Sequence, residues 1–153
     1  MENFLETLKT TAESAESQKE NAYLERKKYE AKRDSEMILE ITESLKTKLM
    51  QEAKNGNRQY TVLEASMHGD YSNRKVAFYD YGKCFANSLT MYDWETFYNL
   101  RNDEKTIQKI IAKSKGVFKA VYEYCQKEGL NPIVKFFDDG VGQTYGYGIY
   151  INW

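Results

Sequence analysis

The first 54 residues carry the apolar spacing of a helix. They contain no proline or glycine and are dominated by Glu, Lys, Ala, Leu, Ser and Thr, which favours helix along most of their length. Two apolar seams run along this stretch. The first consists of Leu5, Leu8, Ala12, Ala15 and Ala22, and the second consists of Ala31, Ile38, Ile41, Leu45 and Leu49. Residues 25–34 between them are mostly charged. We predict a helical arm that is either a coiled coil, through self-association into a homodimer, or a helical hairpin broken near Asp34.

Strand patterns follow once Asn55-Gly56-Asn57 has ended the arm. Residues 59–65 and 74–81 are rich in aromatic and β-branched side chains, and the polar stretch 66–73 joins them. We therefore predict that the two segments pair as antiparallel strands.

The last fifty residues carry the clearest signals. Apolar residues at helical spacing predict one long amphipathic helix from Asp103 to Glu128, closed by Gly129 at the left-handed position and by Leu130 packing back. Residues 133–137 and 145–153 then predict two strands. In the last strand Tyr145, Tyr147, Ile149, Ile151 and Trp153 share one face, which we expect to be buried. The other face, with Gly146, Gly148 and Tyr150, is expected to be open.

Together these segments predict an α+β protein. A long N-terminal helical arm, residues 1–54, precedes a ββαββ domain, residues 55–153, with a four-stranded antiparallel sheet and one covering helix.

Composition excludes some classes of protein. Lys and Arg number 22 and Asp and Glu 23, a formal charge of −1, which argues against a dedicated DNA-coating protein. No apolar stretch resembles a signal peptide or a membrane span, and Cys84 and Cys125 lack metal-ligand spacing. We expect a soluble cytoplasmic protein without a membrane partner, in which each thiol is a small buried apolar group.

Catalytic chemistry has little support in the sequence. The one histidine, His68, lies in a polar loop and is expected to be solvated. Glu64, Asp80, Asp138 and Asp139 offer a weak case for a divalent-metal-dependent nuclease, because three elements would have to converge on one ion. Asp-Asp-Gly after a strand is also ordinary turn chemistry, so whether Asp80, Asp138 and Asp139 form a site is open. We predict no catalytic residue, no metal and no cofactor, and a protein that is not an enzyme.

Two sets of surface residues offer binding chemistry. Lysines at i,i+4 on the predicted long helix, namely Lys105, Lys109 and Lys113, give a basic stripe for an alternative nucleic-acid-binding function. The chain has 13 tyrosines, a residue that contributes large contact area at low entropic cost. The predicted contacts to a protein partner are Tyr71, Tyr79, Tyr81, Tyr92 and Tyr150, which lie on loops or faces that the core does not need.

In general character the chain resembles the small accessory proteins of bacteriophages and mobile elements in Gram-positive bacteria. The resemblance rests on its Lys-, Glu-, Asn- and Tyr-rich, proline-poor composition over the whole length and on the lack of a catalytic motif. Such proteins include anti-CRISPR proteins, which occupy the working surface of a nuclease. The resemblance implies a stoichiometric inhibitor of a host defence nuclease or of its nucleoprotein complex, acting in the cytoplasm of the bacterial host.

Overall fold

The computed structural model describes residues 3–66, 77–80, 84–85, 102–138 and 145–153. The chain divides into two compact units, residues 1–36 and residues 37–153. The second unit begins inside the N-terminal helix, whereas the sequence predicted a boundary after residue 54. The reason is that Met37, Ile38 and Ile41 pack against the core and Leu45 is part of it.

The N-terminal helix α1 (Phe4–Lys54) is uninterrupted over 51 residues. Asn3 caps its start, because its side-chain oxygen accepts the Leu5 N–H at 3.1 Å. Gly56, at φ +83°, ends it, and the Asn57 N–H donates to the Glu52 carbonyl at 3.0 Å. The predicted helix and its end are confirmed. The helical hairpin was wrong, because α1 continues through Asp34 in a stretch that has no helix breaker.

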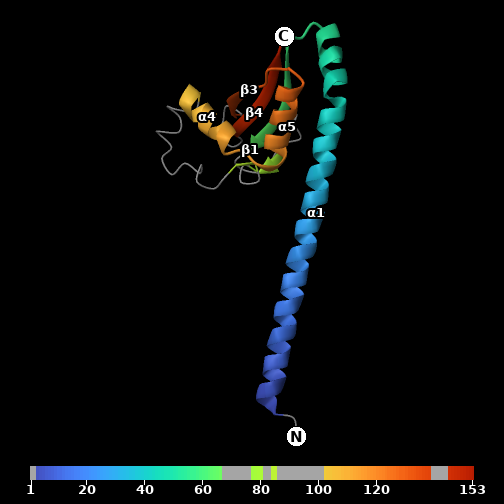
Figure 1. The fold of residues 1–153 in the computed structure, drawn as a ribbon, viewed down its shortest axis with the longest axis vertical. Coiled ribbons are helices and arrows are strands. Elements are labelled where there is room, and N and C mark those ends of the chain that lie inside the picture. The colour runs from blue at the N-terminus through green and yellow to red at the C-terminus, as the bar shows by residue number, and fades with distance from the viewer. Residues whose placement is uncertain (1–2, 67–76, 81–83, 86–101, 139–144) are drawn as a thin grey trace. The chain divides into compact units, whose positions relative to one another are not determined.

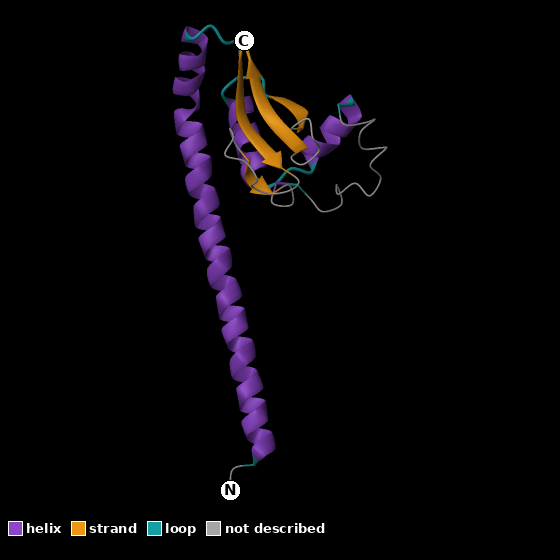
Figure 2. Cartoon of the chain, turned by 180° about the vertical axis from the view of Figure 1, so that it is seen from behind, coloured by secondary structure: helices purple, strands orange, loops and turns teal. Residues whose placement is uncertain are grey.

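Four strands make the sheet of the described residues: β1 (Gln59–Ser66), β2 (Ala77–Asp80), β3 (Ile133–Asp138) and β4 (Tyr145–Asn152). Their order is β2-β1-β4-β3, and Figure 2 shows them in orange. Only β1, β4 and β3 pair antiparallel; β2 pairs parallel with β1 over Glu64–Ser66. The α+β class and the antiparallel β3–β4 hairpin are confirmed. The four-stranded antiparallel sheet was wrong, because the antiparallel part has three strands.

The strand order leaves one edge of β1 for β2. One edge of β1 is taken by β4 along its whole length, from Gln59 to Ser66. The connection from β1 to β2 is too long to require a tight hairpin, so it allows a parallel return that a two-residue turn would forbid.

The single covering helix predicted over residues 103–128 is also not what the structure shows. Two shorter helices stand there, α4 (Glu104–Ala112) and α5 (Gly116–Lys127). Ser114 forms an isolated bridge with Phe85, and the Lys115 N–H donates to the Cys84 carbonyl at 2.6 Å. Gly116 has φ +59°, a conformation that costs glycine little. Pairing with a distant segment therefore interrupts the helix. Gly129, at φ +70°, ends α5 as predicted.

The core lies between α5 and one face of the sheet, and α5 covers that face in both views (Figures 1 and 2). Phe85 is fully buried, with its ring centroid 4.7 Å from that of Phe118 and 6.4 Å from that of Tyr147. Burial raises the pKa of Tyr147 to about 12. Cys84 and Cys125 are free and buried, as predicted, and burial raises the pKa of Cys125 to about 11.

The buried face of β4 matches the prediction except at its end. Tyr145, Tyr147, Ile149 and Ile151 are buried, but the Trp153 side chain is 45% exposed, so its predicted burial was wrong. Strand pairing ends at Asn152, and the Trp153 backbone N–H donates to the Arg58 carbonyl at 3.1 Å. No helix in the described ranges is both long and apolar enough to cross a membrane.

Candidate functional site

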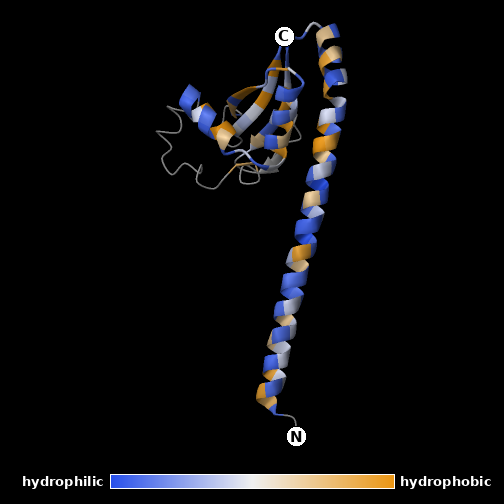
Figure 3. Ribbon diagram, viewed as in Figure 1, coloured by the Kyte–Doolittle hydropathy of each residue, from blue (hydrophilic) through white to orange (hydrophobic). Residues whose placement is uncertain are grey.

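Residues 3–36 of α1 form a helix with exposed apolar side chains. Every described residue from Asn3 to Tyr29 is exposed. The exposed fractions of Phe4, Leu5 and Leu8 are 72%, 63% and 49%, and that of Tyr29 is 67%. Figure 3 shows the first turns of α1 in the orange of hydrophobic residues, with hydrophilic turns following. Contiguous exposed apolar groups of this kind mark contact surfaces in soluble proteins.

This helical segment obtains little stability from its own unit. Helices in water are held mainly by packing of an apolar face, because nucleation is unfavourable and propensity adds little per residue. The local contacts are weak ones: Lys27 lies 4.8 Å from the centroid of the Tyr23 ring, and Lys32 and Glu36 form an exposed ion pair at 3.9 Å. The first apolar seam is thus a surface without a packed counterpart among the described residues.

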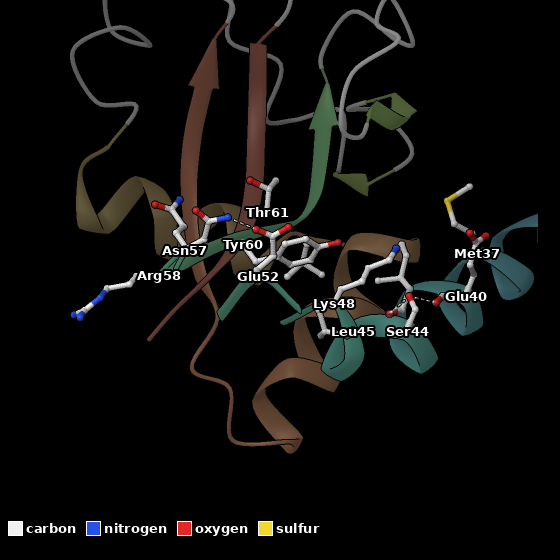
Figure 4. Close-up of a pocket in the computed structure, with 13 residues that line it drawn as sticks. Met37, Glu40, Ser44, Leu45, Lys48, Glu52, Asn57, Arg58, Tyr60 and Thr61 are labelled. Carbon is white, nitrogen blue, oxygen red and sulfur yellow. Dashed lines mark hydrogen bonds between the residues drawn. The ribbon is translucent and has the colours of Figure 1, made fainter. Parts of the chain in front are cut away.

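A second feature is a groove between the second half of α1 and the first half of β1 (Figure 4), both within residues 37–153. Its volume is about 680 Å³, which is the size of many ligand sites. Ile41, Leu45 and Val62 supply apolar wall, and Lys48 adds a cation. The chain reverses at Gly56, so β1 starts beside the last turns of α1.

Glu52 organises the polar end of this groove. The Asn57 side-chain amide donates a hydrogen bond to the Glu52 carboxylate, and the Tyr60 ring lies beside it (Figure 4). Burial raises the pKa of Tyr60, and the negative charge of Glu52 raises it further. Tyr60 therefore stays protonated at neutral pH and can donate. The groove offers hydrogen bonding and apolar contact, and its described lining has no histidine or cysteine.

Three neighbouring strands place a polar cluster on the sheet face opposite the α5 side. Gly148 is paired with both Glu64 and Lys135, so these two side chains and that of Tyr150 belong to one face. The Tyr150 hydroxyl donates to Glu64 Oε1 at 3.4 Å, and Lys135 Nζ lies 5.8 Å from the Tyr150 ring centroid. Burial, and then the charge of Glu64, raises the pKa of Tyr150 far above its ordinary value. The cluster ties β1, β4 and β3 together through a neutral tyrosine.

The open strip expected along Gly146, Gly148 and Tyr150 was wrong. All three residues are buried, and Tyr150 is 8% exposed. A Cβ added at Gly148 would lie 2.8 Å from the Tyr150 hydroxyl oxygen, and one at Gly146 would lie 1.8 Å from the Ala65 carbonyl oxygen. The glycines make room for a tyrosine ring and for a neighbouring strand of the same chain. A contact of Tyr150 with a partner stays a prediction.

The other predicted partner contacts receive no structural account. Tyr71, Tyr81 and Tyr92 lie outside the described residues, as does His68. Tyr79 lies in β2, where it pairs with Ala65. Its role in binding a partner stays a prediction.

The lysine stripe is partly retained. Lys105 and Lys109 are exposed on α4, and Lys113 is exposed at its C-cap. The break before α5 puts Lys115 and Lys119 beyond a change of direction, so the basic face is shorter than the sequence predicted. Three exposed cations remain within about three helical turns.

Asp80 and Asp138, two of the carboxylates proposed for a metal-dependent nuclease, do not lie close together. Asp80 and Asp138 lie on β2 and β3, the opposite edges of the sheet, three strand spacings or about 14 Å apart. Asp139 lies outside the described residues. Over the described ranges there is no group of three His, Cys, Asp or Glu residues able to hold a metal ion.

Sequence reasoning missed the residues of the groove, notably Lys48, Glu52, Asn57 and Tyr60. The available signal was Asn55-Gly56-Asn57, which predicts a tight reversal and hence a strand returning beside the helix. Which side chains then meet depends on how α1 packs, and the local pattern does not specify this.

Comparison with protein families, with curated proteins and with solved structures found no match to this chain.

Proposed function

We propose that this chain is a non-enzymatic protein-binding protein that associates through residues 3–36 of α1, with a second copy of itself as the helical partner. The single observation that carries the proposal is the exposure of Phe4, Leu5 and Leu8 on a helix that has no packed counterpart among the described residues.

The spacing of the seam supports a helical partner. Leu5, Leu8, Ala12 and Ala15 follow intervals of three and four residues, as the inner positions of a coiled coil do. The alanines allow close approach of a second helix, and the leucines supply most of the apolar area. Stoichiometric inhibition of a nuclease is one form of such a function, in which the dimer presents residues 37–153 to its target.

The test is the molar mass of full-length variants, measured by light scattering. Leu5→Glu combined with Leu8→Glu places charge in the seam and should return the chain to 17.9 kDa. Thr10→Glu combined with Ser17→Glu places the same charges on the opposite side of the helix, by helical spacing, and should leave the dimer intact. Equal masses for both variants and the unmodified chain would contradict association through this seam.

Nucleic-acid binding is the second candidate, favoured by exposed Lys105 and Lys109 one turn apart on α4. Its affinity should fall steeply with salt, since each lysine that contacts phosphate releases counterions. Lys105→Glu with Lys109→Glu should abolish a gel shift seen at low salt. If the unmodified chain gives no shift at low salt, this candidate is excluded.

A further inference from the structure

The exposed part of α1 carries two blocks of opposite charge. Residues 4–25 contain five acids and two bases, a balance of −3, whereas residues 26–33 contain five bases and one acid, a balance of +4. All but two of the charged residues in the two blocks are exposed, Glu30 and Arg33 being half-buried. The same helix therefore has a negative end and a positive end.

Apolar groups gather at both ends of this segment. Phe4, Leu5 and Leu8 lie in the negative block, and Tyr29, which shares their side of the helix, lies in the positive block. The turns between the two apolar groups are dominated by small and polar residues, among them Ala12, Ser14, Ala15 and Ser17. Two copies can bury these apolar groups whether they lie parallel or antiparallel, so the apolar pattern does not choose an orientation.

The charges distinguish the parallel pair from the antiparallel pair. Packed helices lie about 8–10 Å apart, which is close to the Debye length at physiological salt, so facing blocks interact. A parallel pair in register would set the +4 block of one copy against the +4 block of the other. An antiparallel pair of residues 4–33 sets the +4 block against residues 4–11 of the other copy, where the charges of Glu6 and Lys9 cancel, so this repulsion is removed.

We propose that residues 4–33 of two copies pair antiparallel, each positive block lying against residues 4–11 of the partner and away from the partner's positive block. This inference rests on the proposed function, since it names the orientation of that association. The paired segment spans about 45 Å at 1.5 Å per residue. The midpoint falls between Gln18 and Lys19, and Ala15 of one copy faces Ala22 of the other, where small side chains permit close approach.

Cross-linking of full-length protein separates the two orientations. Thr7→Cys and Lys32→Cys are made as separate proteins, one of them carrying a tag, and are mixed, allowed to exchange and treated with a short bis-maleimide. Cys84 and Cys125 are buried, so they do not compete for the reagent. The unmodified chain, treated in the same way, is the control that shows that Cys84 and Cys125 do not react.

Antiparallel pairing predicts a mixed Thr7→Cys/Lys32→Cys product in excess over either self-linked product by roughly tenfold, the ratio that corresponds to about 1.4 kcal/mol. The excess should shrink as salt is raised, because screening removes the preference. Self-linked Thr7→Cys as the main product would overturn the antiparallel orientation while leaving the proposed association standing. A dimer that gives neither product would overturn the orientation too. A monomeric mass at every concentration would overturn both the orientation and the proposed self-association.

Discussion

The two parts of α1 have the same secondary structure and different surroundings. From Asn3 to Tyr29 every described residue is exposed, whereas Leu45 is 1% exposed and part of the core. Lys46 bonds to Glu128 just after the end of α5, yet no described residue from Asn3 to Tyr29 has a long-range bond of this kind. The difference shows that one continuous helix can be a structural element in one part and a contact surface in the other.

Leucine truncation in each part gives the largest expected contrast. Leu45→Ala removes a fully buried side chain and should lower the free energy of unfolding by about 2–5 kcal/mol, regardless of protein concentration. Chemical denaturation monitored by circular dichroism measures this loss. A loss below about 0.5 kcal/mol, the range of surface substitutions, would contradict the packing of α1 against the core.

Leu8→Ala is the matched substitution in the exposed part. It should weaken association by roughly tenfold, or about 1.4 kcal/mol, and its effect on unfolding should vanish upon dilution to the monomer. Sedimentation equilibrium of the variant beside the unmodified chain measures the shift. An effect on unfolding that persists at low concentration would mean that Leu8 packs within its own chain.

Two glycines of β4 test the packing of residues 37–153. Gly146→Ala meets the backbone of Ala65 and cannot be relieved by a rotamer change, whereas Gly148→Ala meets the Tyr150 ring, which can move. Both should destabilise residues 37–153 without changing the dimer mass, by about 1–3 kcal/mol as for overpacked cores, and Gly146→Ala should cost more. Thermal unfolding of the two variants checks the order. A reversed order would contradict the close approach of β4 to β1.

The expected effect is smallest at the Lys46–Glu128 ion pair, whose atoms lie 2.6 Å apart. The hydrogen bond to Lys46, and then its charge, lowers the pKa of Glu128, and the same two causes raise the pKa of Lys46. The contribution of Glu128 to the free energy of unfolding is therefore fully present above the ordinary pKa of glutamate. It is lost as the pH falls through the lowered pKa of Glu128. The contribution of Lys46 is fully present below the ordinary pKa of lysine, and it is lost as the pH rises through the raised pKa of Lys46.

Lys46→Met should accordingly lower the melting temperature slightly at neutral pH. The difference in melting temperature between the variant and the unmodified chain should disappear in acid, at pH values below the usual pKa of glutamate. Lys48→Met is the control, because no described acid pairs with Lys48. A gap that stays constant down to the acid limit would show that the pair contributes nothing through charge.

Local signals predicted the parts of the fold that local interactions decide. A stretch without proline or glycine gave α1, the Gly129 turn ended α5, and period-two alternation identified β4 and its buried face. Each of these depends on neighbouring residues along the chain, so a single sequence contains the information.

Long-range pairing accounts for what could not be predicted. Ser114 leaves the helix because Phe85, far along the chain, forms a bridge with it, and the direction of β2 is set by its pairing with β1. The groove beside Tyr60 depends in the same way on the packing of α1 against β1. The exposure of Trp153 follows from where strand pairing ends, which the alternating pattern does not show.

Association through the exposed part of α1 is the central claim, and sedimentation equilibrium of the unmodified chain tests it most directly. The account predicts a mass that rises to twice 17.9 kDa as the protein concentration reaches the high micromolar range. A mass that stays at 17.9 kDa over that range would contradict it.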